Sequence, residues 1–203
     1  MTGLTRINPR DPAETRGKSR SLITAAVLLS TLHSGPSVEQ TSQGTRPPVP
    51  IVASFDGLGV GFTSLQPTTD GRNPSDNSLA VGPNHIVQIV NSRFVVFTKK
   101  GAMFDTTGKL IYGAMPTNTL FAGFGGPCEA RPNGDAVVRY DQLANRWLYV
   151  MPIFRRPAND STGPYSMCYA LSKGADPTGP FYQYEFKRPL FPDYPRPAVW
   201  PDG

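Results

Sequence analysis

The stretch GDAVVRYDQLANRWLYVMPIF, residues 134–154, constrains the fold most, because it holds two strand-forming runs separated by a short turn. Ala136–Tyr140 is apolar and β-branched, and Arg146–Ile153 is a second apolar run. Asp141–Asn145 between them carries turn-forming residues. The connection is too short for a crossover helix, so the two runs should pair antiparallel.

Two further strand-like runs follow, Ser166–Ser172 and Phe181–Phe186, and the sequence KGADPTGP between them is a strong turn signal. Four consecutive short strands joined by tight turns predict a meander, which is the form of one blade of a β-propeller. Aromatic residues at strand positions should fill the space between blades, and stacking on a sugar is the alternative role. These residues are Trp147, Tyr149, Tyr182 and Tyr184.

A weak repeat supports more than one such meander. Aligning Val81, Val138 and Val199 places Asn84, Asp141 or Asp202 three residues later each time. Similarity that recurs at roughly 60 residues is typical of repeat architectures. We therefore expect an all-β fold of four-stranded antiparallel blades, an incomplete β-propeller of about two blades plus a stub. The expected blades are about 79–124 and 134–188, and the start of the next is 196–203.

The composition agrees with an extracellular all-β chain. Only 17% of residues are charged, whereas 20 glycines and 22 prolines supply turns. The net charge of +5 could indicate nucleic acid, but residues 1–34 hold five of the basic side chains, and the rest form no basic stripe. We therefore expect no nucleic-acid partner.

The N-terminus has the pattern of a secretory signal peptide. The basic sequence RGKSR at 16–20 precedes Leu22–Leu32, an eleven-residue mostly apolar run. Eleven residues are too few to span a bilayer, and a buried helix of the mature domain is the alternative. We therefore expect residues 1–34 to be a signal peptide, with a secreted or cell-surface protein and no membrane span in the mature chain. Residues 35–50 are predicted to be a linker, and 51–203 a partial β-propeller domain that begins with a short strand at Ile51–Phe55.

Four segments resemble the N-terminal part of a group of large secreted bacterial β-propeller proteins, most of them uncharacterised. They are Leu120–Cys128, Gly134–Trp147, Ala175–Gly179 and Phe191–Gly203. The resemblance implies a propeller fold and a location outside the cytoplasm, but no reaction. Members of the group continue for several more blades, so this chain looks truncated at the start of a third. Where relatives tend to have Gly-Asp-Pro, this chain has Gly-Asp-Ala at 134–136.

The two cysteines, Cys128 and Cys168, are an even number in an apparently secreted chain, which predicts a disulfide. Such a bridge is expected to stabilise the fold by roughly 3–4 kcal/mol, mainly by restricting the unfolded chain. Two separate buried thiols are the alternative. Neither cysteine is expected to be catalytic, because His85 is the one histidine beyond the predicted signal peptide.

Recognisable catalytic and metal motifs are few. His85 begins an apolar strand without a nucleophile elbow, and no histidine or cysteine spacing fits zinc. The loop at 70–77 is rich in oxygen ligands, and Asp70, Asp76 and Asn77 could hold calcium. That loop lacks the regular spacing and terminal glutamate of a calcium loop, so a solvated turn is the alternative.

Three aspartates each precede a predicted first strand of a blade: Asp76, Asp135 and Asp193. First strands lie nearest the central channel of a propeller, so these side chains could converge there. Together they could act as an acid–base pair, or bind sugar hydroxyls or a cation. The alternative is that each one accepts hydrogen bonds from the backbone of a tight turn.

These observations favour a secreted or cell-surface β-propeller module that binds a carbohydrate or protein ligand, with no catalysis assigned. The first alternative is a propeller glycoside hydrolase or lyase that uses the three aspartates. The second is a truncated fragment without function, because two blades and a stub leave strand edges exposed.

Overall fold

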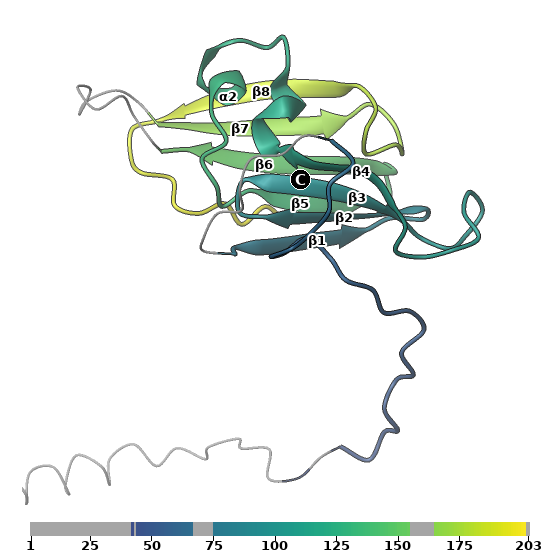
Figure 1. Ribbon diagram of the computed structural model, residues 1–203. Coiled ribbons are helices and arrows are strands. Elements are labelled where there is room, and N and C mark those ends of the chain that lie inside the picture. Colours follow the sequence, from purple (N-terminus) through teal and green to yellow (C-terminus); the bar gives the residue numbers. More distant parts are fainter. Residues whose placement is uncertain (1–41, 43, 67–74, 155–164, 202–203) are drawn as a thin grey trace, which may run out of the picture. The chain divides into compact units, whose positions relative to one another are not determined.

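Eight strands form two four-stranded antiparallel sheets, and consecutive strands are neighbours in each sheet (Figure 1). The computed structural model describes residue 42 and residues 44–66, 75–154 and 165–201. The first sheet contains β1 (Asn77–Val81), β2 (His85–Val90), β3 (Arg93–Thr98) and β4 (Leu110–Pro116). The second contains β5 (Val137–Asp141), β6 (Arg146–Ile153), β7 (Tyr165–Ser172) and β8 (Phe181–Arg188). The prediction of a mostly-β chain with antiparallel meanders is confirmed.

Two short helices connect the sheets, the 3₁₀ helix η3 (Thr117–Phe121) and α2 (Gly126–Ala130). Several predictions fall on residues outside the described ranges: the signal peptide at 1–34, Asp70, and the end of the repeat at Asp202. Within the described ranges, no helix has both the length and the apolar character needed to cross a lipid bilayer.

Turn chemistry sets the strand register, as the hairpin at 137–153 illustrates. The Asp141 carboxylate accepts hydrogen bonds from the backbone N–H groups of Leu143 and Ala144, both at 2.9 Å. Asn145 then takes a left-handed conformation, with φ 55°, which asparagine tolerates better than most residues. The turn predicted at Asp141–Asn145 is therefore correct, and β5 pairs with β6 from Val137 opposite Val150 to Asp141 opposite Arg146.

The structure corrects the alignment of the repeat. Val81 is the last residue of β1, whereas Val138 is the second residue of β5. Val81 is therefore not equivalent to Val138. The sequence pattern misled because Asn84 lies within its turn, whereas Asp141 ends its strand.

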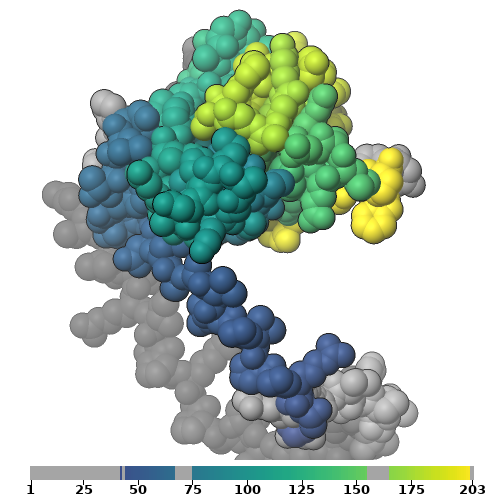
Figure 2. All heavy atoms as spheres, turned by 90° about the vertical axis from the view of Figure 1, so that its right-hand side faces the viewer, coloured from purple at the N-terminus to yellow at the C-terminus, as the bar shows by residue number. Residues whose placement is uncertain are grey.

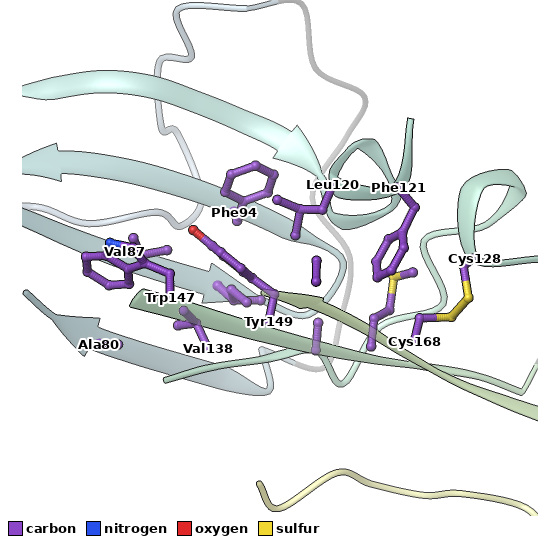
Figure 3. Packing of buried hydrophobic residues seen from close by; sticks show 14 of the residues in the cluster. Ala80, Val87, Phe94, Leu120, Phe121, Cys128, Val138, Trp147, Tyr149 and Cys168 are labelled. Carbon is purple, nitrogen blue, oxygen red and sulfur yellow. A yellow bond between two sulfur atoms is a disulfide. The ribbon is translucent and has the colours of Figure 1, made fainter. Parts of the chain in front are cut away.

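The hydrophobic core lies where the two sheets pack face to face (Figure 3). Trp147 and Tyr149 of β6 are buried, and Tyr149 packs edge-on against Phe94 of β3 with 5.9 Å between the ring centres. Their polar atoms are satisfied, since Trp147 Nε1 donates to the carbonyl of Ala175 at 2.9 Å and the Tyr149 hydroxyl to that of Pro177 at 3.3 Å. These two aromatic residues are core residues, as predicted.

The first strands of the two sheets are neighbours. Ser78 of β1 and Val138 of β5 are both buried, and Ser78 Oγ accepts a hydrogen bond from the Val138 backbone N–H at 3.1 Å. Because this N–H has no partner within its own sheet, the serine hydroxyl satisfies it across the sheet–sheet contact. The contact fixes the starts of β1 and β5 side by side.

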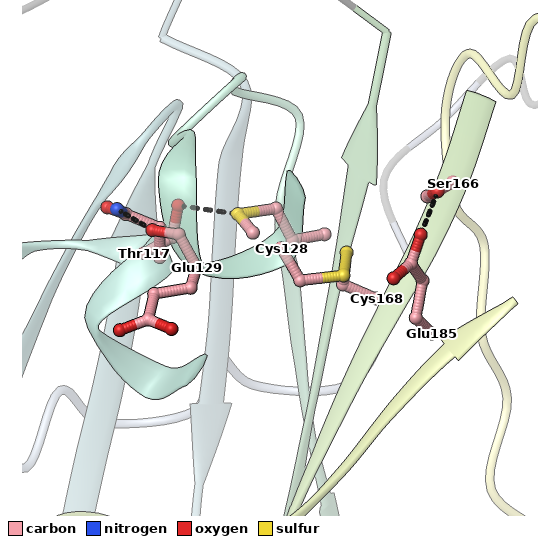
Figure 4. The surroundings of a disulfide bond; sticks show 8 residues. Thr117, Cys128, Glu129, Ser166, Cys168 and Glu185 are labelled. Atoms are coloured by element: carbon pink, nitrogen blue, oxygen red, sulfur yellow. Dashed lines mark hydrogen bonds between the residues drawn. A yellow bond between two sulfur atoms is a disulfide. The ribbon is translucent and has the colours of Figure 1, made fainter. Parts of the chain in front are cut away.

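The disulfide between Cys128 and Cys168 is present, which confirms the prediction (Figure 4). It joins α2 to β7, and both cysteines are fully buried. Beside it, the Thr117 hydroxyl of η3 donates to the sulfur of Met151 on β6 at 3.1 Å. The bridge therefore holds the connection between the two sheets against the second sheet.

The outer faces of the two sheets differ. Phe55 and Phe62 pack on Phe97 of β3, with ring centres 5.0 and 6.2 Å away, so residues before β1 cover part of the first sheet. On β8 of the second sheet, Tyr182, Tyr184 and Phe186 point to the outer face and are 43%, 46% and 49% exposed. The prediction that Tyr182 and Tyr184 are core residues is therefore wrong for the described residues, because no described segment covers that face.

The strand predicted at Ile51–Phe55 is also wrong for these two sheets. The segment belongs to neither sheet, and Ile51 and Val52 are 85% and 94% exposed. Its β-branched composition satisfies the propensity of a strand, but a strand also needs a neighbour for its backbone hydrogen bonds.

Candidate functional site

A hollow of about 410 Å³ lies at the starts of β1 and β5. Three separate parts of the chain line it: the residues that enter β1, the residues that enter and form β5, and the segment after β8. The side chains that matter chemically are Asp76, Asp135, Arg139, Tyr194 and Arg196. The hollow therefore combines carboxylates, guanidinium groups and an aromatic ring.

Asp76 and Asp135 occupy similar positions in the two sheets. Asp76 directly precedes β1 and Asp135 lies two residues before β5, both with left-handed backbones, φ 37° and 51°. Asp76 is held by the β2–β3 turn, because Asn91 Nδ2 donates to Asp76 Oδ2 at 2.8 Å. Gly134 must lack a side chain, since a Cβ there would lie 2.8 Å from Asn91 Oδ1 and its φ is 104°.

The carboxyl groups of Asp76 and Asp135 both border the hollow and lie close enough to interact. Partial burial is the largest cause that raises the pKa of Asp135, to about 6. The hydrogen bond to Asp76 and the negative charges of Asp76 and Asp193 raise it further. Below this pH Asp135 is protonated, so its carboxyl group can both donate and accept hydrogen bonds. Above it the two carboxylates repel each other.

The three aspartates predicted from sequence thus fall in one region, although in unequal roles. Asp76 and Asp135 are in contact, whereas Asp193 acts on Asp135 through its charge. The Asp76 carboxylate accepts a hydrogen bond from the side-chain amide of Asn91, and the alternative role of these aspartates, capping the backbone of a tight turn, stays a prediction.

Sequence reasoning missed the basic and aromatic side chains of the hollow. Arg139 of β5 donates through Nε to the carbonyl of Pro197 at 3.1 Å, which holds the segment after β8 beside the first strand. Arg196 stacks its guanidinium over the ring of Tyr194, 4.5 Å from the ring centre. Arg139 could have been noticed in the sequence, because it is a charged residue within the apolar run Ala136–Tyr140. Tyr194 and Arg196 come near Arg139 only through the fold.

A metal centre is not assembled among the described residues, where no group of three or more His, Cys, Asp or Glu side chains could hold an ion. Asp76 is committed to Asn91 and Asp135, and Asn77 is exposed at the start of β1. Asp70 lies outside the described residues. The calcium prediction therefore stays a prediction.

The opposite end of the sheets carries the β3–β4 connection and the β7–β8 turn, teal and yellow-green in Figure 2. His85 lies at that end, where burial lowers the pKa of its imidazole and the charge of Asp176 opposes the shift. Its ring packs edge-on against Phe104 at 5.4 Å. His85 is therefore a packing residue at the far end from the hollow.

No family model matches the chain, and neither a curated protein nor a solved structure matches it. The resemblance to secreted bacterial β-propeller proteins therefore stays a prediction. The chemistry of the hollow is interpreted from its own geometry.

Proposed function

We propose that the two sheets are adjacent blades of a β-propeller in a secreted or cell-surface protein. Three features support this arrangement: each sheet is a four-stranded meander, the sheets pack face to face, and their first strands are neighbours. A buried disulfide is consistent with an oxidising compartment. In such a ring, β1 and β5 would lie nearest the central axis.

We further propose that the hollow beside β1 and β5 binds a carbohydrate. The observation that carries this proposal is the convergence of Asp76, Asp135, Arg139 and Tyr194 on one hollow. Carboxyl oxygens accept hydrogen bonds from sugar hydroxyls, and a guanidinium donates to them. The half-exposed ring of Tyr194 offers an apolar surface to the C–H face of a pyranose.

A glycoside hydrolase or lyase is the second candidate, because Asp135 has a pKa of about 6 beside a second carboxyl group. The geometry favours binding over this reaction. The two catalytic carboxyl groups of a glycosidase stand about 5 Å apart or more, so that the glycosidic bond fits between them. Asp76 and Asp135 interact directly enough for Asp76 to raise the pKa of Asp135, which favours a closer spacing than this.

A glycan-array screen of the intact protein tests the proposal, with a product assay on every glycan that binds. Asp135→Asn and Asp76→Asn should weaken binding at least tenfold, because each removes a carboxylate acceptor. Asp105→Asn is the matched control, since Asp105 is an exposed aspartate in the β3–β4 connection at the other end of the sheets. Absence of glycan binding, or equal binding by all three variants, would contradict the proposal.

Two further readouts separate the alternatives in the same screen. Turnover of a bound glycan that disappears in Asp135→Asn would establish the hydrolase or lyase. Loss of binding with EDTA would assign a cation to the loop that contains Asp70 and Asp76.

A further inference from the structure

We propose that residues Ile51–Ser54 of one copy of this chain pair, as an added strand, with the free edge of β8 in a second copy. Ile51–Ser54 is called the donor segment below. Its four side chains are exposed, and Ile51 and Val52 present large apolar surfaces to solvent. A β-branched segment of this kind gains backbone hydrogen bonds and burial by adding to a sheet edge.

The β4 edge of the first sheet is already occupied. Leu65 N–H donates to the carbonyl of Gly113 on β4 at 2.9 Å, and the N–H of Gly113 donates to the side-chain oxygen of Gln66 at 2.7 Å. The chain therefore caps β4 with its own residues 65–66. A capped edge cannot accept the donor segment at the same place.

The edge of the second sheet is open. The Lys173 N–H donates to the carbonyl of Pro180 at 2.8 Å, so this pair fixes the alternation of hydrogen bonds along the β7–β8 hairpin. By that alternation Phe181, Gln183, Glu185 and Lys187 direct their backbone N–H and C=O groups away from β7. Among the described residues, no backbone hydrogen bond from another segment reaches these groups. Figure 1 shows β8 as the last strand of its sheet.

The side chains of the two strands are complementary. Tyr182, Tyr184 and Phe186 form an apolar row on the outer face of β8. Alternation places Ile51 and Ala53 on one face of the donor segment, where they would extend this row. The donor segment carries no charge, so it brings no like charge to Glu185 or Lys187 on the open edge.

The acceptor must belong to a second copy, because a chain cannot deliver the segment to its own β8. Phe55, the next residue, packs on Phe97 on the outer face of the first sheet. The second sheet packs on the opposite face of the first sheet, so the first sheet lies between Phe55 and the second sheet, to which β8 belongs. Four extended residues span only about 14 Å. The same four residues would have to cross from the outer face of the first sheet to β8 and also pair along β8, and they are too short for both. Reciprocal exchange between two copies would give a closed two-fold dimer.

The first test is the mass of the full chain in solution, measured by light scattering during size-exclusion chromatography. The proposal expects twice the mass of one chain. Ile51→Lys with Val52→Lys should convert it to one chain, because the double substitution removes the apolar side chains that the donor segment would bury. It also brings two positive charges to an edge where Arg146 and Lys173 already lie over the ring of Tyr182. Val60→Lys is the control, since Val60 is fully exposed outside the donor segment and its variant should stay dimeric. A wild-type chain with the mass of one copy, or a double variant that stays dimeric, overturns the proposal.

A second test locates the contact. A photo-crosslinking amino acid at Ala53, in a mixture of isotope-labelled and unlabelled chains, should join one copy to peptide 181–188 of the other. Crosslinks confined to one chain, or to a different peptide, overturn the proposal. The Ile51→Lys, Val52→Lys variant should keep its glycan binding, because the hollow at Asp135 lies elsewhere. The dimer and the carbohydrate site can therefore fail independently.

Discussion

Removal of the Cys128–Cys168 disulfide should cost about 4 kcal/mol of unfolding free energy. The bridge spans 40 residues, and a loop of that length restricts the entropy of the unfolded chain by about 13 cal/mol/K, or about 4 kcal/mol at 25 °C. Both cysteines are fully buried, so a Cys128→Ala, Cys168→Ala variant also loses a small amount of packing, about 1 kcal/mol. The native contacts of α2 with β7 otherwise stay available.

Urea unfolding at a fixed protein concentration, followed by tryptophan fluorescence, measures this loss. Trp147 is fully buried in the core between the sheets and reports its exposure, whereas Trp200 is 74% exposed and changes little. Wild-type protein in the presence of a reductant is the control. Its free energy of unfolding should fall, relative to the oxidised wild type, by nearly the same amount as that of the double variant. A loss below about 1 kcal/mol in both would refute the loop-entropy argument for this bridge.

Two other predictions follow from the sheet contact and the carboxyl pair. Because the pKa of Asp135 is higher in the folded protein than in the unfolded chain, stability should fall as pH rises from about 4 to above 6. Asp135→Asn should therefore be about 1 kcal/mol more stable than wild type at pH 8, after allowance for solvent screening, and equally stable at pH 4. A stabilisation that is larger at pH 4 than at pH 8 would contradict the predicted pH dependence. Gly82→Ala should cost about 2 kcal/mol, since its Cβ would lie 2.7 Å from the ring of Trp147. Gly174→Ala, where a Cβ meets nothing within 4 Å, should change stability by less than about 0.5 kcal/mol in the same urea titration; equal costs at the two glycines would show that the sheets do not pack as described.

The sequence predicts most of the second sheet, because its strands are bounded by local signals. The aspartate and asparagine at the two ends of the 141–145 turn both adopt the turn roles that their side chains favour. The disulfide is equally accessible to sequence reasoning, since a chain with two cysteines and an apparent signal peptide allows a single pairing. These features need no knowledge of contacts distant in the chain.

Features that depend on distant contacts were harder to predict. The alternation of Tyr182 and Tyr184 shows that they share a face, but not whether any segment covers that face. Ile51–Phe55 has strand propensity, but propensity does not supply a neighbouring strand. In the hollow, the aspartates were found from their repeated position before a first strand. Arg139 and Tyr194 lie 55 residues apart in sequence, and the hydrogen bond from Arg139 to Pro197 holds the segment that contains Tyr194 beside β5.

The crystal structure of the intact protein with a bound glycan from the array tests the central claim most directly. The account predicts a sugar ring in the hollow at the starts of β1 and β5, with a hydroxyl in hydrogen-bond contact with the Asp135 carboxyl group and its C–H face on Tyr194. A glycan bound elsewhere on the described surface, with the hollow empty, would contradict it.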